Sequence, residues 1–484
     1  MIDAPPKATR WGLLALTVLV SGCAVGPRYA APKTPAGAQG EFLSARAMAD
    51  VKNDPLPDHW WRLYQDPVLD RLVAQALNEN RDLKVAAANL AYAEGVLGEA
   101  RSGRFPGTTV SGATPAYGRS ASQVAIGAPA LTTYSGAFSA SYQLDLFGRV
   151  RRSIEAARAN LDATRTAEDV VRVTVAGATA NAYAQACGYA AQVAVARRSV
   201  DLLQNAYDLT RVERDAGALS DFDLDRQSAL LNQAKAAVGP LDGQRRAALF
   251  SLAALIGKPP AEIPAEAAAC AAPPTLTRPL PVGDGVALLR RRPDIRQAER
   301  LLAAATARIG VATADLYPTI SLGGTIADSL VSSASLGNYN STAYSVGPVL
   351  SWSFPNILVA RAHIREANAQ ASAALASFDS TVLGALRDTE TALSAYDAEL
   401  SRHHSLIDAQ RDAGDAYRLA DIQFKAGSAS FLDLLTTESA KITADQAVAL
   451  SDQTLASDQI TVFQQLGGGW EDAPAVAPLK LPKG

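Results

Sequence analysis

The chain has 484 residues, of which 48% are hydrophobic and 19% are charged, and its net charge is −3 at pH 7. This balance argues against a nucleic-acid-binding protein, which normally carries a strongly basic domain or stripe, and against a polybasic segment that binds a membrane surface. Four His and three Cys are too few for a disulfide framework and make a metal cage hard to build. We therefore expect no metal, no cofactor and no nucleic acid as a partner.

The N-terminus is typical of an export signal. Two basic residues precede an apolar stretch at 11–20, which is too short to span a bilayer core of about 30 Å but has the length of a signal-peptide core. The next residues, Val20-Ser21-Gly22-Cys23, resemble the bacterial lipobox. That resemblance implies cleavage of the signal peptide 1–22 and a covalent lipid on Cys23, as S-diacylglycerol and an N-acyl group. Ala24 stands where an Asp usually signals inner-membrane retention, so outer-membrane sorting is favoured. The alternatives are a chance Cys behind an ordinary signal or a buried N-terminal helix.

After an N-terminal segment at 23–65, residues 66–257 form one unit of helix, two strands, a very long helix and a further helix. Apolar residues recur at helical spacing through 67–101. The stretch 149–216 lacks Pro and is rich in good helix formers, which predicts a helix of about 100 Å. It stops at Gly217, a suitable C-terminal cap, and a helix over 220–257 follows from Ser220, a good N-cap candidate.

Between these helices the apolar period changes from 3.6 to 2 residues. Apolar side chains alternate with small polar ones through 134–146, and more weakly through 107–117. Strands of this length with one apolar and one small polar face fit the wall of a transmembrane β-barrel. Alternation alone also allows a soluble amphipathic hairpin that covers a core.

The sequence contains two copies of this unit. The offset between the copies is 212 residues at Asp82 and Asp294, and becomes 210 at the pair Gly217 and Gly427. A register held this long indicates an internal duplication. The second repeat, 283–467, is predicted to contain a helix at 284–314, strands at 319–328 and 344–354, a long helix at 361–426 and a helix at 430–466. A Pro- and Ala-rich linker at 258–282 joins the copies, and 468–484 forms a C-terminal tail.

The strand count requires association between chains. Four strands cannot close a barrel, and open sheet edges are not tolerated in lipid. Two chains would supply eight strands around a filled interior, and three would supply twelve around a lumen. The strands alone do not decide between these numbers. Helices of the predicted length also imply coiled-coil packing or a rod-like assembly.

No phosphate-binding loop, nucleophile elbow or zinc-protease motif occurs in the sequence, so we predict that the protein is not an enzyme. His403 and His404 are expected to be a solvated pair, and the Arg clusters at 149–152 and 290–292 to be solvated or near headgroups. Cys187 and Cys270 could pair in an oxidising compartment. Their spacing does not require it, and the favoured interpretation is two free thiols.

Several short motifs together resemble the outer-membrane efflux factors, the TolC-like channels, and specifically their NodT-type lipoprotein branch. They follow one another through nearly the whole mature chain: Cys23-Ala-Val-Gly-Pro-Arg-Tyr29, Trp60-Trp61, Asn80-Arg-Asp82-Leu83, Asp145-Leu146-Phe147-Gly148-Arg149, Arg291-Arg292-Pro293-Asp294-Ile295 and Leu466-Gly-Gly-Gly-Trp470. The resemblance implies a mainly α fold with a transmembrane β part. In that fold a homotrimer forms a 12-stranded β-barrel in the outer membrane and a 12-helix α-barrel through the periplasm.

The same resemblance implies the function and the partners. The trimer would be the outer-membrane channel of a tripartite efflux system in a Gram-negative bacterium, lipid-anchored and extending into the periplasm. A periplasmic adaptor (membrane fusion) protein and an inner-membrane RND-type pump would complete it, and drugs or other small amphipathic molecules would leave through it passively. The alternative is a structural coiled-coil outer-membrane lipoprotein without a lumen.

The family's periplasmic aperture is closed by the helical hairpins and lined by acids. Its aperture aspartate corresponds to Asp433, whose counterpart in the first repeat is Asp223. Three copies would form a carboxylate ring, although both acids could simply be solvated residues at a helix start. Some relatives carry a second acid, a Tyr and an Arg where this chain has Thr436, Phe424 and Ala429, so the closing network differs here. The resemblance also places adaptor and pump docking at the hairpin turns, around Gly217, Ser220, Gly427 and Ser430.

Overall fold

A computed structural model describes residues 24–33, 40–48, 50–118, 126, 131–330, 342–354 and 357–479. The expected signal peptide and Cys23 lie outside the described residues. The chain divides into two compact units. The first takes its residues from 1–32, 90–164 and 297–379, and the second from 33–89, 165–296 and 380–484. Among the described residues, no helix is both long and apolar enough to cross a membrane.

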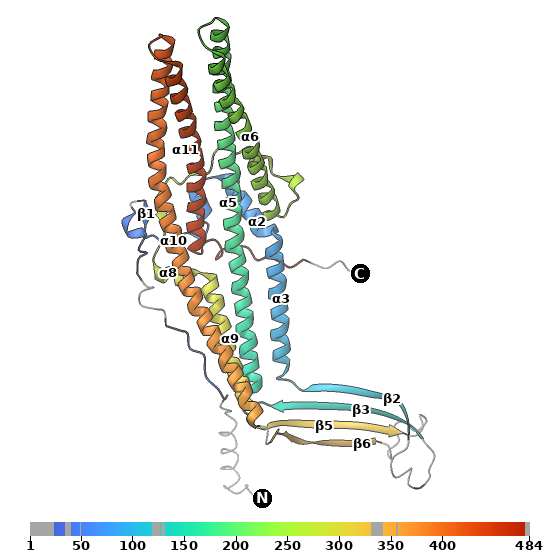
Figure 1. Cartoon of the computed structure of the whole chain (residues 1–484). Coiled ribbons are helices and arrows are strands. Elements are labelled where there is room, and N and C mark those ends of the chain that lie inside the picture. The colour runs from blue at the N-terminus through green and yellow to red at the C-terminus, as the bar shows by residue number, and fades with distance from the viewer. Residues whose placement is uncertain are drawn as a thin grey trace. The chain divides into compact units, whose positions relative to one another are not determined.

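The duplication in the sequence is also a duplication of elements (Figure 1). The first repeat contains α2 (Pro67–Glu79), α3 (Arg81–Ser102), β2 (Gly107–Gly118), β3 (Leu131–Leu144), α5 (Arg149–Asp215) and α6 (Asp221–Leu255). The second contains α8 (Gly285–Arg291), α9 (Pro293–Ala314), β5 (Thr319–Leu330), β6 (Thr342–Ser351), α10 (Ile357–Lys425) and α11 (Phe431–Gln465). Short elements precede or separate the repeats: η2 (Ala45–Ala47), β1 (Val51–Lys52), η3 (Trp60–Tyr64), η4 (Pro260–Glu262), α7 (Ala265–Ala268) and β4 (Leu280–Pro281).

Two predicted helices are each broken in two. The helix expected over 67–101 is interrupted at Asn80, whose extended backbone ends α2 and whose Oδ1 accepts hydrogen bonds from the Asp82 and Leu83 amides at 2.9 and 3.2 Å. Asn80 therefore caps the start of α3. The helix expected over 284–314 is interrupted at Arg292, because the residue before a proline is driven out of the helical region by Pro293.

The four strands β2, β3, β5 and β6 form one antiparallel sheet in that order (Figure 1). The β3–β5 pairing joins the two repeats. One register row brings together Val110, Phe138, Ile326 and Tyr344, all of which are exposed. The next row consists entirely of hydroxyl side chains, from Thr109, Ser139, Thr325 and Ser345. The sheet therefore has an uncovered apolar face and a small polar face, and its edge strands in a single chain are β2 and β6.

The main core of the second unit explains two of the sequence motifs together. Trp60 is 1% exposed and stacks on Phe463 with ring centroids 4.8 Å apart. The glycine run after α11 allows this approach: a Cβ on Gly468 would come within 2.6 Å of Leu56 and 2.9 Å of Trp60, and one on Gly469 within 3.0 Å of Trp61. The Trp-Trp and Gly-Gly-Gly motifs are thus two sides of one contact.

Helices α5 and α11 pack closely at the only two glycines of α5. A Cβ on Gly177 would lie 2.9 Å from Gln464, and one on Gly188 would lie 2.5 Å from Gln453. The two glycines are 11 residues apart, as are the two glutamines, and 11 residues are close to three helical turns. The glycines therefore face α11 along one stripe, with the two helices running in opposite directions.

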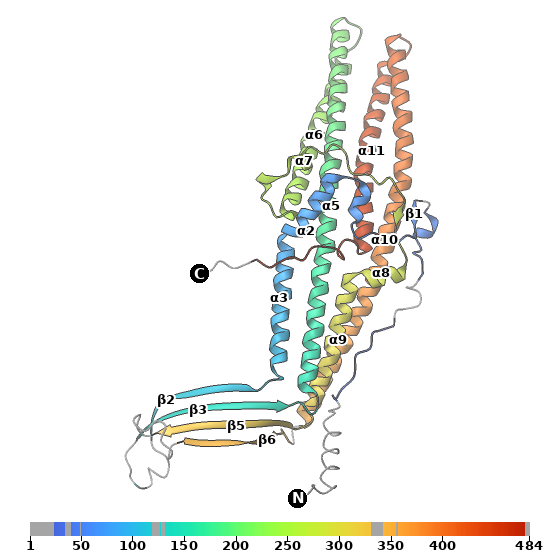
Figure 2. The same ribbon diagram turned by 180° about the vertical axis from the view of Figure 1, so that it is seen from behind.

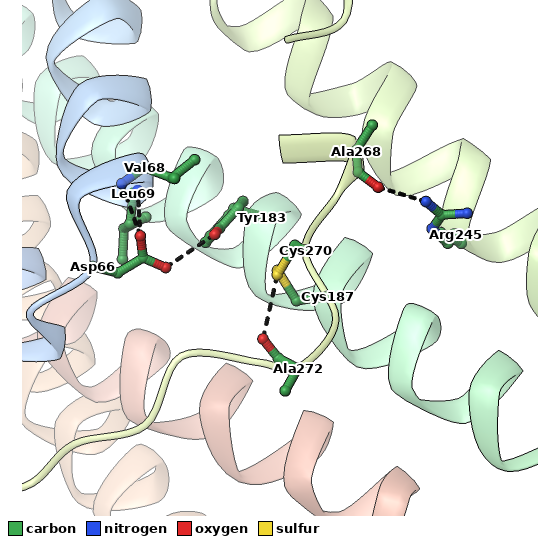
Figure 3. Close-up of a disulfide and its surroundings, with 9 residues drawn as sticks. All are labelled: Asp66, Val68, Leu69, Tyr183, Cys187, Arg245, Ala268, Cys270 and Ala272. Carbon is green, nitrogen blue, oxygen red and sulfur yellow. Dashed lines mark hydrogen bonds between the residues drawn. A yellow bond between two sulfur atoms is a disulfide. The ribbon is translucent and has the colours of Figure 1, made fainter. Parts of the chain in front are cut away.

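The linker between the repeats is packed and covalently held, contrary to the prediction of two free thiols. Cys187 of α5 and Cys270 of the linker form a disulfide across 83 residues of sequence, and Figure 3 shows it beside Ala268, whose carbonyl accepts a hydrogen bond from Arg245 at 2.6 Å. Farther on, β4 pairs in parallel with β1. The linker thus crosses α5 and adds a strand to the N-terminal segment.

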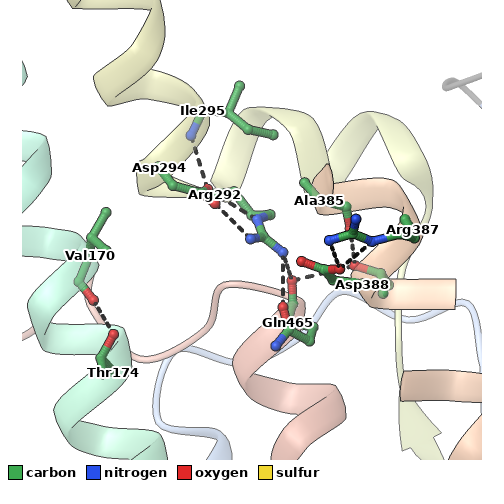
Figure 4. A network of polar contacts seen from close by, with 10 residues as sticks. Val170, Thr174, Arg292, Asp294, Ile295, Ala385, Arg387, Asp388 and Gln465 are labelled. Atoms are coloured by element: carbon green, nitrogen blue, oxygen red, sulfur yellow. Dashed lines mark hydrogen bonds and ion pairs between the residues drawn. The ribbon is translucent and has the colours of Figure 1, made fainter. Parts of the chain in front are cut away.

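The Arg-Arg-Pro-Asp motif joins the start of α9 to the end of α11 (Figure 4). Arg292 donates to both carboxylate oxygens of Asp294, at 3.0 and 2.6 Å, and to the Gln465 carbonyl at 2.7 Å. A cation at the C-terminal carbonyls of a helix is favourably placed. Arg291 pairs with Asp58 at 2.6 Å. The expectation that the cluster 290–292 is solvated or near headgroups was therefore wrong for Arg291 and Arg292, whereas Arg290 is exposed.

Candidate functional site

The two helical hairpins of the second unit, α5–α6 and α10–α11, have their turns at the same end (Figure 2). Gly217 and Gly427 have φ values of 78° and 72°, which a residue with a Cβ adopts only with strain. The residue after each glycine donates its amide back by five positions: Ala218 to the Glu213 carbonyl and Ser428 to the Gln423 carbonyl, each at 2.9 Å. This Schellman closure confirms the glycine caps that the sequence predicts.

A capping box restarts the chain after each turn. Ser430 precedes α11, and its Oγ accepts the Asp433 amide at 3.2 Å and donates to Asp433 Oδ2 at 2.6 Å. The Ser430 amide also donates to Oδ2, at 3.2 Å. Ser220 and Asp223 repeat the arrangement at α6, with distances of 3.3, 2.6 and 3.1 Å. These bonds lower the pKa of each Asp, so both are ionised at neutral pH.

The structure therefore places Asp433 and Asp223, the two acidic aperture candidates, in the first turns of α11 and α6. The serine of the same capping box hydrogen-bonds to each carboxylate. The capping role that was the alternative interpretation is present, and it fixes the carboxylates at the tips. Thr436 is exposed and donates its hydroxyl to the Leu432 carbonyl at 2.7 Å. Phe424 lies 6.1 Å from Phe431, ring centre to ring centre, so it packs within its own hairpin. Ala429 lies in the turn itself.

A buried polar pair near these turns had not been predicted. Glu438 of α11 is 3% exposed and Gln227 of α6 is 0% exposed. Glu438 Oε1 and both polar atoms of Gln227 have no hydrogen-bond partner among the described residues. Burial raises the pKa of Glu438 to about 7, and the adjacent Gln227 amide offsets this only in part. The sequence did hold a signal, because Glu438 follows the buried Leu435 by three residues, on its apolar stripe.

The histidine pair is not uniformly solvated as expected. His404 is exposed, but the His403 side chain is only 17% exposed. Its Nδ1 lies 3.3 Å from Ser451 Oγ and its Nε2 lies 3.6 Å from Asp452. The order Ser-His-Asp resembles a catalytic triad, but the fully buried Ser451 hydroxyl donates to Glu399. No described group of His, Cys, Asp and Glu side chains is arranged to hold a metal ion.

The segment that follows Cys23 is clamped onto the first unit. The Val25 amide donates to the Phe147 carbonyl at 3.2 Å. Arg152, which is 4% exposed, donates to the carbonyls of Val25 and Gly26 at 3.2 and 3.1 Å. Gly26 lies so close to Gly310 that a Cβ would come within 2.6 Å of its Cα. Arg152 is thus a buried clamp, and the prediction that its cluster is solvated or near headgroups was wrong for this residue.

Comparisons with known proteins agree with this architecture. The sequence profile of the outer membrane efflux protein family matches residues 72–258 and 286–468, which covers both repeats. Nodulation protein T of Rhizobium leguminosarum bv. viciae is 30% identical over 478 residues, covering 97% of this chain and 95% of that protein. The antibiotic efflux pump outer membrane protein ArpC of Pseudomonas putida is 28% identical over 497 residues, covering 98% and 99%.

Solved structures give the same result. The outer-membrane channel OprN aligns with a TM-score of 0.85 at 33% identity, over 93% of this chain and 100% of that one. The open state of the Neisseria gonorrhoeae MtrE outer membrane channel aligns with a TM-score of 0.79 at 26% identity, over 93% and 99%. Family, relatives and structures agree on a transport protein of the outer membrane. The chain belongs to the outer membrane efflux protein family and is an outer-membrane efflux channel.

Proposed function

We propose that three copies of this chain form the channel, with a twelve-stranded β-barrel and a twelve-helix periplasmic tube. The observation that carries the proposal is the four-stranded sheet with edge strands β2 and β6 and two unlike faces. An exposed row containing Phe138 and Ile326 suits contact with lipid. The next row, whose hydroxyl side chains lie on the opposite face of the sheet, suits a water-filled lumen. Eight strands would leave an interior filled by side chains, whereas twelve leave a passage.

We propose further that the channel is the passive outer segment of a tripartite pump. The chain carries no motif for an energy source, so a periplasmic adaptor and an inner-membrane RND-type pump would drive export. Relatives are named for antibiotic, toluene and pyoverdine export, and such unlike cargoes support a generic lumen for small molecules. The hairpin turns at Gly217, Ser220, Gly427 and Ser430 are the proposed docking points, because they are the solvent-exposed ends of both hairpins.

The lipid anchor on Cys23 is proposed from the lipobox and supported by the clamp behind it. Ala24, the next residue, lies against Gly148, where a Cβ would meet it at 2.6 Å. Gly148 stands between the end of β3 and the start of α5, so acyl chains on Cys23 would start beside the end of a barrel strand. Intact-mass measurement of the purified protein tests this proposal. It predicts loss of residues 1–22 and a lipid adduct, and an unmodified Cys23 would contradict it.

The proposed aperture ring of Asp433 is tested by single-channel conductance in planar bilayers. Asp433→Ala removes both the charge and the capping box, whereas Ser430→Ala breaks the same box and keeps the carboxylate. We expect Asp433→Ala to raise the conductance of the isolated channel, because a ring of three carboxylates binds cations at the narrow aperture and delays their passage. Ser430→Ala should stay near the wild type. Equal conductance of Asp433→Ala and wild type would remove the gate role.

Asp223 is proposed to support the ring in the first repeat, beside Asp221 and Asp225. Asp223→Ala should therefore change the conductance in the same direction as Asp433→Ala but less. Thr436 and Phe424 are proposed to line the aperture without charge. Thr436→Asp would restore a second acid, and we expect it to increase the cation selectivity measured by reversal potential in a salt gradient.

A further inference from the structure

The buried pair of Glu438 and Gln227 connects helices that belong to different hairpins. Glu438 is on α11, in the second repeat, and Gln227 is on α6, in the first. The Gln227 amide lies close enough to Glu438 to lower the pKa of its carboxyl. Both are essentially solvent-free within one chain, so their burial does not depend on neighbouring subunits. Any motion that separates the two hairpins at this level must expose both side chains.

The pair is unusual because it is buried but unsatisfied. Three polar atoms, Glu438 Oε1 and the Nε2 and Oε1 of Gln227, have no hydrogen-bond partner in the described part of the chain. An unpaired polar atom in the interior is unfavourable, and an ionised carboxylate there is far more so. A protonated carboxyl, by contrast, can donate one hydrogen bond and accept another from the primary amide opposite it. Burial therefore favours neutral Glu438, and the Gln227 amide, which lowers its pKa, offsets this effect only in part.

The charged groups around Glu438 do not offset its burial. From α10, Asp421 acts on it with the same sign and raises its pKa further, and Asp421 is itself paired with Lys425 at 2.8 Å. Tyr417, also on α10, has its own pKa raised by burial and then by Glu438 and Asp421. On α11 the cation one turn away, Lys441, is engaged by Asp445 at 2.6 Å.

The cations of the first hairpin at this level are engaged elsewhere as well. On α6, Arg226 lies over the Phe222 ring, with its guanidinium carbon 5.6 Å from the ring centre. On α5, Arg214 pairs with Asp221 at 3.1 Å and with Asp215 at 3.0 Å, and Arg211 lies 3.7 Å from Asp208. Each of these arginines thus has a partner other than Glu438.

We propose that Glu438 and Gln227 form a proton-dependent latch between the two hairpins, which holds them together when Glu438 is protonated and releases them when its carboxylate ionises. The inference rests on the proposed function, because the hairpin tips carry the proposed aperture. The channel is then more tightly closed in acid and opens more readily at neutral and alkaline pH.

The direction and size follow from proton linkage. The pKa of Glu438 is raised from 4.5 to about 7 in the latched state, so the latched state binds the proton more tightly than a separated state in which the carboxylate meets water. The latch is at full strength below about pH 4.5 and weakens as the pH rises to about 7. The whole change corresponds to a shift of up to roughly 300-fold in the equilibrium between latched and separated hairpins.

Two measurements on the full-length protein test the latch. Spin labels on Ala218→Cys and Ser428→Cys report the distance between the turns by pulsed electron resonance, because both positions are exposed. The native Cys187 and Cys270 are joined and do not compete for label. From pH 4 to 8.5 the distance distribution should broaden or lengthen, with a midpoint between pH 4.5 and 7. Planar-bilayer conductance of the unlabelled protein should rise over the same range.

Glu438→Gln mimics the protonated acid and should keep the acid-state distance and conductance at every pH. Asp415→Asn changes an exposed acid on α10; it is the matched control and should keep the wild-type midpoint. A pH-independent wild-type distance, or a Glu438→Gln profile equal to that of the wild type, would overturn the latch. A protein that never conducts but still shows the distance change would refute the channel assembly and leave the latch standing.

Discussion

The disulfide between Cys187 and Cys270 offers the sharpest stability prediction. It closes a loop of 83 residues, which spans the end of α5, all of α6 and half of the linker. A constraint of that length on the unfolded chain is worth about 4.5 kcal/mol in the loop-closure treatment, and measured disulfides commonly give 2–4 kcal/mol. We therefore expect reduction to lower the free energy of unfolding of the helical unit by about 2 to 4.5 kcal/mol.

The folded state should survive this reduction, since the linker has other contacts. Leu280 and Ala267 are each 1% exposed, and the Leu280 amide donates to the Asp50 carbonyl at 2.9 Å. Urea titration in detergent, followed by fluorescence of the buried Trp60 and Trp61, measures the loss with and without reductant. The double variant Cys187→Ala/Cys270→Ala is the control and should not respond to reductant. A loss below about 1 kcal/mol on reduction would refute the reasoning.

Two further predictions concern close packing and the clamp. Gly188→Ala places a Cβ about 2.5 Å from Gln453 and should lower the free energy of unfolding by about 1–3 kcal/mol through overpacking. Gly384→Ala on α10 meets nothing within 4 Å and should raise the free energy of unfolding by about 0.5–1 kcal/mol. Thermal unfolding of both variants tests this prediction, and equal shifts in the two variants would contradict it. Arg152→Ala removes the donor that holds the segment after Cys23, so the Val25 amide should exchange faster with deuterium while the amides of α11 stay unchanged. Unaltered exchange at Val25 would show that the clamp does not depend on Arg152.

The large elements could be predicted because their signals extend over dozens of residues. The helices α5 and α10 end at Asp215 and Lys425, each within one residue of the expected bounds, since a glycine with positive φ follows at both turns. The strand β3 lies at Leu131–Leu144 rather than 134–146, because alternation predicts a face better than an end. The break at Arg292 was also readable from Pro293, since a proline disfavours helix in the residue before it.

The disulfide and the buried pair of Glu438 and Gln227 could not be predicted, because they depend on contacts between segments far apart in the chain. No spacing rule brings Cys270 back across α5 to Cys187, because that path is set by the packing of the whole linker. The sequence did predict a helix that starts at Ser430, but it could not show that Glu438, eight residues later, faces the buried Gln227 of another hairpin. The apolar stripe placed Glu438 inside, and only the packing of α11 identified its neighbour.

We propose above all that three copies of the chain associate into a hollow tube. Single-particle electron microscopy of the detergent-extracted, full-length protein tests it most directly, through views along and across the particle. We predict threefold end-on views with a central hole and side views of a tube longer than about 100 Å, the length of α5 at 1.5 Å per residue. A compact particle, or a rod whose end-on views show no hole, would contradict it and favour a coiled-coil lipoprotein without a lumen.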